Sequence, residues 1–148
     1  MIAIGADHGG YKLKEEIKKY LEEKGIEYKD FGTYDNERTD FPLYAEKVCK
    51  SIQNKECDKG ILLCTSSAGM QITANKFKGI RCVSCSTEDF AKQAKEHLNA
   101  NVIALPAGYI NISEAVAMIR VWLGSEYLQG RYNERLKLIE EIEKENMK

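Results

Sequence analysis

Short apolar runs alternate with amphipathic stretches along almost the whole chain, and this alternation constrains the fold more than any other feature. The runs of strand length and nearly continuous apolar character are residues 2–5, 26–31, 60–64, 80–85 and 101–105. Strands that are apolar on both faces are typical of a parallel sheet covered by helices on both sides, because a sheet with one solvated face alternates apolar and polar residues. The sequence therefore predicts a five-stranded parallel sheet.

The segments between these runs carry apolar residues at helical spacing. Leu13, Ile17 and Leu21 form one stripe, lysines and glutamates fill the opposite face, and Gly25 follows as a C-terminal cap. The same reasoning predicts helices over residues 11–23, 43–52, 70–77, 88–98 and 113–123. Strands that alternate with helices indicate a doubly wound fold. We therefore predict a three-layer α/β/α architecture of the Rossmann-like kind.

The sequence contains no linker, repeat or low-complexity segment, which predicts a single domain over residues 1–148. The tail, residues 132–148, places Leu136, Ile139 and Ile142 on one stripe among many charges, and no strand follows it. This pattern predicts a terminal helix. A helix with an apolar stripe buries it either on its own domain or against a partner subunit, and the sequence leaves both open.

Composition limits the classes of partner. The 148 residues include 22 Lys and Arg against 23 Asp and Glu, so the formal net charge is −1, and no global field favours nucleic acid or an anionic membrane. No segment approaches ~18 consecutive apolar residues, and the amino terminus lacks the pattern of a secretory signal. The five cysteines form an odd set that argues against a disulfide framework. We expect a cytoplasmic protein with reduced thiols, which binds small molecules or further copies of itself.

Polar residues follow several of the predicted strands. In a parallel α/β sheet, ligands bind at the edge where the carboxyl ends of the strands lie, which we call the rim. The segment Asp7-His8-Gly9-Gly10 follows the first strand, Cys64 ends the third, and Ser84-Cys85-Ser86-Thr87 follows the fourth. We expect Asp7, His8 and Cys64 to lie together on this rim.

The loop after Cys64 has the composition of an anion cradle. Thr65, Ser66 and Ser67 offer hydroxyls, and successive amides up to Gly69 precede a helix, so the loop could hold a phosphate or a developing oxyanion. The alternative is a simple Ser/Thr helix cap. The same helix terminus would lower the pKa of the Cys64 thiol and make it a base or nucleophile, whereas the alternative for Cys64 is a buried, inert cysteine.

The remaining cysteines do not form a metal site. Cys49 and Cys57 are interpreted as structural. Cys82 and Cys85 have CxxC spacing, but strand alternation places them on opposite faces, and no second Cys/His pair accompanies them. We therefore predict no metal.

His97 precedes the strand at residues 101–105 and so lies at the wrong end of it to join the rim within one subunit. It could reach the site of a neighbouring subunit if the protein forms an oligomer, and the alternative is an ordinary polar residue. Arg131 and Arg135 are four residues apart, so on a helix they face the same way and could clamp a phosphate with their planar donor groups. The alternative for the arginines is solvated surface charge.

Taken together, these segments resemble the family of type B ribose-5-phosphate isomerases and the related galactose-6-phosphate isomerases. The resemblance runs almost from end to end of the chain. It includes Asp7-His8-Gly9-Gly10, Arg38-Thr39-Asp40-Phe41-Pro42, Cys64, Ala74-Asn75-Lys76, Gly79-Ile80-Arg81, His97, Asn99-Ala100-Asn101, Gly130-Arg131 and Arg135. The resemblance implies an aldose–ketose isomerase for sugar phosphates that works through a cis-enediol without metal or cofactor. It also implies a site shared between the two subunits of a homodimer, and such dimers could pair into tetramers.

The resemblance also implies roles for individual residues. Cys64 would be the base that moves a proton between C1 and C2, with Ser66 at the family's hydroxyl position. His97, helped by Asp7, would open the furanose ring. The residues implied to hold the phosphate are His8, Arg131 and Arg135. The other residues expected around the substrate are Thr65, Ser67, Gly69 and Phe41.

Four departures from the family pattern lie in the expected substrate shell. Thr65 and Ser67 replace two glycines, Phe41 replaces a tyrosine, Leu98 replaces an asparagine, and residues 105–109 lack an arginine. We expect the reaction type to survive with ribose 5-phosphate as the favoured substrate. Galactose 6-phosphate, another pentose or hexose phosphate, and binding without turnover are the alternatives. A flavin- or nucleotide-binding module on a similar sheet is a further alternative, whereas a signalling receiver would need an aspartate in place of Cys64.

Overall fold

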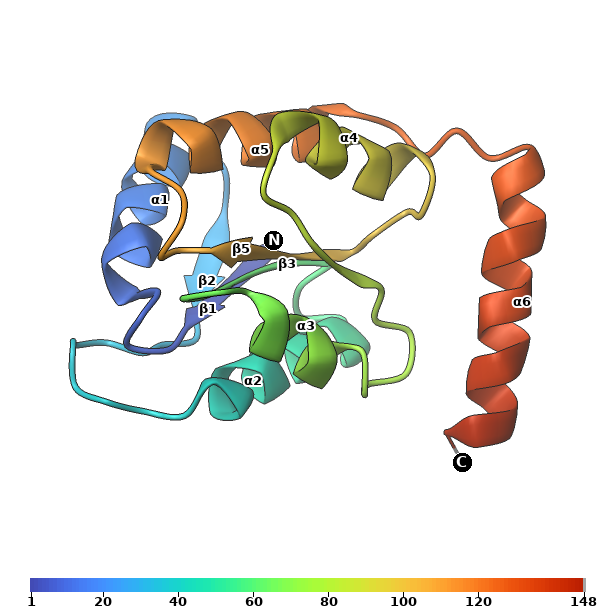
Figure 1. The fold of residues 1–148 in the computed structure, drawn as a ribbon, viewed down its shortest axis with the longest axis horizontal. Coiled ribbons are helices and arrows are strands. Elements are labelled where there is room, and N and C mark those ends of the chain that lie inside the picture. Colours follow the sequence, from blue (N-terminus) through green and yellow to red (C-terminus); the bar gives the residue numbers. More distant parts are fainter. Residues whose placement is uncertain (148) are drawn as a thin grey trace.

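The computed structural model describes residues 1–147 and confirms the predicted sheet. The strands are all parallel and lie in the order β2-β1-β3-β5-β4 (Figure 1). Their bounds are β1 Ile2–Ala6, β2 Tyr28–Asp30, β3 Lys59–Cys64, β4 Cys82–Ser84 and β5 Val102–Pro106. The two strands predicted over 26–31 and 80–85 are shorter than expected, because they are the outer strands of the sheet and each pairs with only one neighbour.

The order of the strands places a topological switch point between β1 and β3. The chain moves from β1 to β2 on one side and from β3 towards β5 and β4 on the other. In the register, Ala6 lies opposite Leu63, and Cys64 lies opposite Pro106 of β5. The crevice outside the carboxyl ends at such a switch point is where open α/β sheets bind ligands. The fold therefore predicts a ligand site at the loops after β1 and β3.

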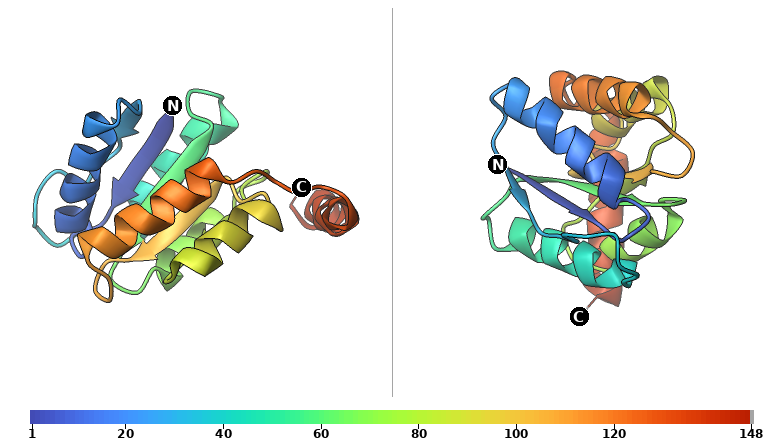
Figure 2. Two further views of the ribbon diagram at one scale, coloured as in Figure 1. Left: turned by 90° about the horizontal axis from the view of Figure 1, so that it is seen from above. Right: turned by 90° about the vertical axis from the view of Figure 1, so that its left-hand side faces the viewer.

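Helices cover both faces of the sheet (Figures 1 and 2). One face carries α1 Tyr11–Glu23, α4 Glu88–Glu96 and α5 Ile112–Gly124, and the other carries α2 Phe41–Gln53 and α3 Ala68–Ala74. Each face has its own apolar core, and neighbouring strand residues alternate between them: Ile61 and Leu63 pack on one side and Leu62 on the other. Cys82 and Cys85 likewise lie in different cores, as the alternation predicts. The three-layer architecture is confirmed.

The helix ends follow local backbone chemistry. α1 ends before Gly25, which has φ +67° and accepts the left-handed conformation that a C-terminal cap requires. α2 begins earlier than predicted because Pro42 is tolerated in its first turn. α3 begins directly after Ser67 and ends before residue 77, the predicted end of the helix. α4 also ends earlier than the predicted residue 98, because Asn99, with φ +47°, turns the chain away from the helix.

α6, Arg131–Asn146, lies apart from these layers. Figure 1 shows it beyond one end of the sheet and across the direction of β5, and Figure 2 shows it beside the layers when they are seen from above. None of its residues is buried, and Ile139 and Ile142 of the predicted stripe are exposed. Burial of the stripe on its own domain, one of the two alternatives, is therefore not what the fold adopts. The last predicted residue of the tail, 148, lies outside the described part.

Within residues 1–147, no helix combines the length and hydropathy that a membrane crossing requires.

Candidate active site

Asp7 and Cys64 lie side by side on the rim because β1 and β3 are neighbouring parallel strands. Asp7 is buried, and its carboxylate accepts hydrogen bonds from the amides of Gly9 (2.9 Å) and Gly10 (3.2 Å). Its own amide donates to the carbonyl oxygen of Leu63, one residue before Cys64. The turn after β1 is thus tied to the end of β3, and the carboxylate is held in one orientation.

Cys64 is 5% exposed and ends β3. Its carbonyl oxygen accepts a hydrogen bond from the amide of Ala107 at 2.9 Å, and the next carbonyl, that of Thr65, accepts one from Gly108 at 3.0 Å. The pairing of β3 with the chain after β5 therefore continues beyond the strands. The thiol is carried by a segment with hydrogen bonds on both sides, which restricts its position.

Three of the other cysteines, Cys49, Cys82 and Cys85, are buried thiols with raised pKa values. Burial raises the pKa of the Cys49 and Cys85 thiols to about 12 and raises that of Cys82 as well, so these thiols stay protonated near neutral pH. All five cysteines are free. Across residues 1–147, His, Cys, Asp and Glu side chains do not gather in groups of three that could hold a metal ion.

The side chain of Thr65 occupies space that two glycines leave empty. A Cβ atom on Gly9 would overlap the Thr65 hydroxyl, and one on Gly108 would lie 2.7 Å from Thr65 Cγ2. Thr65 therefore stands between the turn after β1 and the turn after β5. This packing explains how the chain accommodates a branched side chain where the resemblance implies a glycine.

Ser67, the second residue in place of a glycine, keeps a glycine-like backbone. Its φ is +66°, in the left-handed region, although it carries a Cβ atom. The side chain is buried, and its hydroxyl bonds to that of Ser84 at the end of β4, whose amide donates to Gln71 Oε1 at 2.6 Å. The hydrogen bond to Ser84 holds the Ser67 side chain against the end of β4 while its backbone keeps the left-handed conformation.

Phe41 and His8 border the same loops. The Phe41 ring lies directly over Gly69, where a Cβ atom would come within 2.6 Å of it. Nδ1 of His8 lies 3.2 Å from the amide nitrogen and 3.1 Å from the carbonyl oxygen of Thr39. The Thr39 hydroxyl in turn is 2.9 Å from that of Tyr44. The loop before α2 therefore orients the imidazole, a role that the sequence analysis did not assign to Thr39 or Tyr44.

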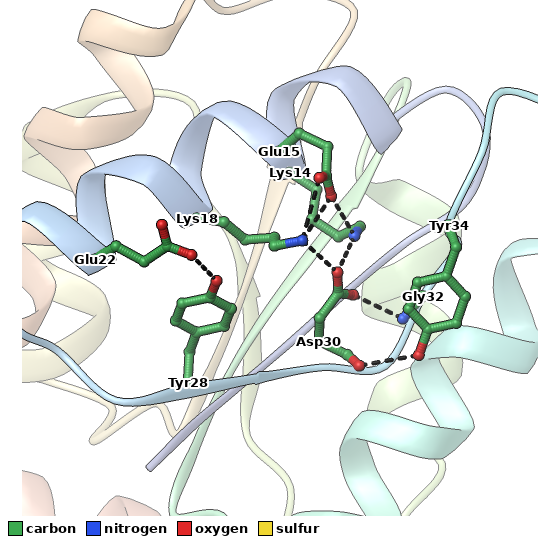
Figure 3. Close-up of polar contacts among 8 residues, drawn as sticks. All are labelled: Lys14, Glu15, Lys18, Glu22, Tyr28, Asp30, Gly32 and Tyr34. Carbon is green, nitrogen blue, oxygen red and sulfur yellow. Dashed lines mark hydrogen bonds and ion pairs between the residues drawn. The ribbon is translucent and has the colours of Figure 1, made fainter.

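A buried charge network holds the start of this loop (Figure 3). Lys14 is fully buried, contrary to its expected place on the charged face of its helix, and its ammonium contacts Asp30 at 2.6 Å and Glu15 at 2.8 Å. Lys18 also contacts Asp30, at 2.9 Å. The second oxygen of Asp30 accepts the Gly32 amide at 2.8 Å. Burial acts to raise the pKa of Asp30, but the hydrogen bonds from the two lysines hold it below its ordinary value.

A second group of predicted residues gathers where α4 meets α6. We call His97, Arg131, Tyr132 and Arg135 the His97 cluster. The His97 ring stacks on Tyr132 with centroids 4.5 Å apart, and the guanidinium carbons of Arg131 and Arg135 lie 5.1 Å and 5.8 Å from the Tyr132 ring. His97, Tyr132 and Arg135 line a cavity of about 240 Å³. The sequence analysis missed Tyr132, although an aromatic residue between two arginines on a helix was a usable signal.

The two groups lie at opposite ends of the sheet. Figure 1 shows the loops after β1, β3 and β5 at one end and α6 beyond the other. The predicted residues carried by the first end are Asp7, His8, Phe41, Cys64, Thr65, Ser66, Ser67 and Gly69. Those carried by α4 and α6 at the other end are His97, Arg131 and Arg135. One chain therefore does not bring all predicted site residues together, as the sequence indicated for His97.

Comparison with known proteins gives concordant results. Residues 2–139 match the family model described as Ribose/Galactose Isomerase. Ribose-5-phosphate isomerase B of Escherichia coli K12 is 42% identical over 142 residues, which cover 96% of this chain and 95% of that protein. The galactose-6-phosphate isomerase subunit LacB of Clostridium acetobutylicum is 36% identical over 143 residues, covering 96% and 83%.

Solved structures agree with the sequence comparison. Ribose-5-phosphate isomerase B of Clostridium thermocellum superposes with a TM-score of 0.95 at 41% identity and covers 97% of both chains. The Mycoplasma genitalium ribose-5-phosphate isomerase B, solved with bound ribulose 5-phosphate, superposes with a TM-score of 0.93 at 32% identity, covering 98% of this chain and 97% of the other.

Proposed function

The chain belongs to the ribose/galactose isomerase family and is an aldose–ketose isomerase, and we propose that its substrate pair is ribose 5-phosphate and ribulose 5-phosphate. The observation that carries this proposal is Cys64 at the carboxyl end of β3, beside the buried Asp7 and directly before a loop of amides and hydroxyls. An isomerase of this kind needs a base next to the C2 carbon and donors for an oxyanion, and this rim supplies both.

In the proposed reaction, the Cys64 thiolate removes the proton from C2 of the open-chain aldose. The electrons of that bond form the C1–C2 double bond, and the C1 carbonyl becomes an oxyanion of the cis-enediolate. The amides of residues 65–69 and the Ser66 hydroxyl stabilise this oxyanion. Cys64 then returns the proton to C1, while the proton of the C2 hydroxyl passes to O1 and leaves the ketone. No step calls for a metal or a cofactor.

The remaining roles follow the two groups of residues. His97, with Asp7 as a helper, protonates and opens the furanose ring before the isomerisation. His8, held through Nδ1 by Thr39, and the arginines 131 and 135 bind the phosphate. Thr65, Ser67, Gly69 and Phe41 shape the wall around the sugar.

These roles require residues from two chains, so we propose a homodimer in which each site combines one rim with the His97 cluster of the partner. The separation of the two groups within one chain supports this arrangement. So does the exposed stripe of α6, since Ile139 and Ile142 lie in water in the single chain and would be covered by a second copy. Pairs of such dimers could form tetramers.

Galactose 6-phosphate is the second candidate substrate, favoured by the likeness to a LacB subunit and by Leu98 in place of an asparagine. Against it, Thr65 and Phe41 fill space beside the loop that a longer sugar would need. Binding without turnover stays as a third outcome.

The five free cysteines support a cytoplasmic location, because thiols stay reduced there. Residues 1–148 as a whole would form the isomerase domain.

The test is NMR in D₂O of the purified protein with a panel of pentose and hexose phosphates. Conversion of ribose 5-phosphate with deuterium entering the exchanging carbon is the expected result. The variant Cys64→Ala should lose the exchange and still bind the sugar phosphate, whereas Cys49→Ala, which removes a buried thiol remote from the rim, should keep it. Conversion of a hexose phosphate alone would identify the second candidate, and exchange by Cys64→Ala would assign the proton transfer to another base.

A further inference from the structure

A polar cavity lies at the edge of the sheet opposite the rim, where the amino ends of the strands lie. Its volume is about 420 Å³. Lys59 opens β3, Arg81 directly precedes β4, and Asn101 directly precedes β5, so this edge is distinct from the one that carries Cys64. Lys95, near the end of α4, and Tyr127, in the segment between α5 and α6, also line the cavity. We call this space the Lys95 cavity.

Lys95 has an unusual environment for a lysine. It is only 8% exposed, and its ammonium lies 5.4 Å from the centroid of the buried Trp122 ring. Among residues 1–147, no carboxylate lies within ion-pair distance of Lys95 and no group forms a hydrogen bond with its side chain. The other buried lysine, Lys14, has two carboxylate partners. No fully enclosed side-chain nitrogen of the described residues lacks a partner, so the unpaired Lys95 ammonium reaches solvent through the cavity and can contact an anion there.

Three basic side chains, Lys59, Arg81 and Lys95, line the cavity with two carboxylates, Asp58 and Glu126, so the lining carries one more positive than negative charge. Arg81 donates through Nε to the carbonyl oxygen of Asn99 at 2.9 Å. It forms no ion pair within 4.0 Å among the described residues, although Glu140 and Glu143 of α6 lie near enough to favour its charge. Asp58 also lines the cavity, but the terminal ammonium of Met1 and the Lys59 side chain both contact it at 3.0 Å. Asp58 is thus already paired. Burial lowers the pKa of Lys95 and the nearby Lys59 charge lowers it further, while Asp58 acts in the opposite direction.

We propose that the Lys95 cavity binds a small phosphate-type anion, with Lys95 as the principal ligand and Arg81 and Lys59 as supporting charges. A tetrahedral dianion has enough oxygens to accept hydrogen bonds from an ammonium and a guanidinium together. The source of the anion is either inorganic phosphate or the phosphoryl group of a metabolite. This site does not depend on the isomerase activity, because none of its ligands is part of the rim or of the His97 cluster.

The location of the cavity also indicates what the anion would do. Ser125, Glu126 and Tyr127 line it and belong to the segment that leads into α6. The same segment is attached to α4 by the bond from the Leu128 amide to the carbonyl oxygen of Glu96. An anion between Lys95 and this segment would add a second attachment, and it would hold the start of α6 in a defined position.

Trp122 provides a direct readout because it is the single tryptophan of the chain and Lys95 lies over its ring. The experiment titrates the full-length protein with inorganic phosphate, and separately with glycerol 3-phosphate, at constant ionic strength set by sodium chloride. We expect a saturable change in Trp122 fluorescence. The variant Lys95→Met should weaken phosphate binding by about tenfold or more, because it removes a charged hydrogen-bond donor. Lys92→Met, which removes an exposed lysine of the same helix, should titrate like the wild type.

Two further measurements keep the interpretation clear. The double variant Arg131→Gln/Arg135→Gln should retain the fluorescence change, which separates this site from phosphate binding at the proposed active site. Thermal unfolding in the Arg131→Gln/Arg135→Gln background gives an independent readout: phosphate should raise the Tm, and the further substitution Lys95→Met should remove that rise. Lys95→Gln repeats the test if Lys95→Met does not fold.

The relative response to the two probes distinguishes the sources. A saturable response to inorganic phosphate or to glycerol 3-phosphate that is lost in Lys95→Met supports the site, and the tighter probe names its ligand. The proposal is overturned if chloride produces the same change, if Lys95→Met titrates like the wild type, or if neither probe gives a saturable response.

Discussion

The imidazole ring of His97 stacks on the phenol ring of Tyr132, with centroids 4.5 Å apart and planes inclined by 12°. His97 caps the end of α4 and Tyr132 lies in the first turn of α6, so this contact joins the two helices. The same phenol lies under both arginines, and its hydroxyl accepts a hydrogen bond from Arg131 at 3.1 Å. One aromatic residue thus organises the groups proposed to open the ring and to hold the phosphate.

Removal of the Tyr132 ring should therefore disturb catalysis more than stability. We expect Tyr132→Ala to lower kcat/KM by about tenfold or more, because displaced catalytic groups lose their alignment with the substrate. Tyr132→Phe keeps the stacked ring and loses only the bond to Arg131, so its loss should be smaller. Steady-state kinetics with ribose 5-phosphate check both variants. Equal activity of Tyr132→Ala and the wild type would show that the stack plays no part in the reaction.

Two inactive variants should restore activity when their subunits are mixed. Cys64→Ala destroys the rim, and His97→Ala destroys the cluster that the partner supplies. A mixed dimer has one site with both defects and one with neither, so random exchange should recover about a quarter of the wild-type activity. The measurement is the isomerase rate after subunits are exchanged under mild denaturant and refolded together. Recovery absent despite proven exchange would place Cys64 and His97 of each site on the same chain.

The packing of Thr65 against Gly108 can be tested by adding a methyl group at residue 108 and removing one at residue 65. Gly108→Ala places a Cβ atom 2.7 Å from Thr65 Cγ2 and should lower the free energy of unfolding by about 1–3 kcal/mol, the usual cost of overpacking. Thr65→Ser removes the opposing methyl group, so in that background the same substitution should cost clearly less. Urea unfolding of the four proteins measures the coupling. Additive effects would mean that the two side chains do not compete for space.

Loss of the Asp30 carboxylate should destabilise the protein through Lys14. Asp30→Asn leaves a fully buried ammonium with one carboxylate instead of two, and we expect a loss of about 3 kcal/mol at neutral pH. Lys14→Met in the same background removes the orphaned charge and should recover part of that loss. Denaturant unfolding of the single and double variants provides the comparison. If the changes in the free energy of unfolding were additive in the double variant, Asp30 and Lys14 would not stabilise each other.

The ion pair between Asp30 and Lys14 also makes the stability of the protein depend on pH. The pKa of Asp30 is lowered in the folded protein, so its contribution to stability is present above its ordinary pKa and is lost as the pH falls through the folded value. Glu15 follows the same sign. The free energy of unfolding of the wild type should therefore decrease below about pH 4, and that of Asp30→Asn should decrease less. If the free energy of unfolding decreased equally with falling pH in both proteins, the Asp30 carboxylate would not be the source of the pH dependence.

The sheet and the rim could be predicted because their signals are local. An apolar run marks a strand buried on both faces, and a polar residue directly after it marks the rim, so the positions of Asp7 and Cys64 follow from the sequence alone. The position of His97 was predictable for the same reason, since it precedes β5 instead of following it. The ends of the outer strands and of α3 and α4 were less predictable, because one-sided pairing and left-handed residues such as Ser67 decide them.

What the sequence by itself determined is therefore the order of elements and the end of the sheet to which each polar residue belongs. Only the tertiary structure decided which polar side chains are buried and what they meet. Lys14 and Lys95 both lie on amphipathic helices that also carry exposed lysines, Lys12 on α1 and Lys92 on α4, yet Lys14 packs against Asp30 and Lys95 over Trp122. These partners come from elements distant in sequence, and helical periodicity reports which face is apolar but not which charge the neighbouring element presents to it.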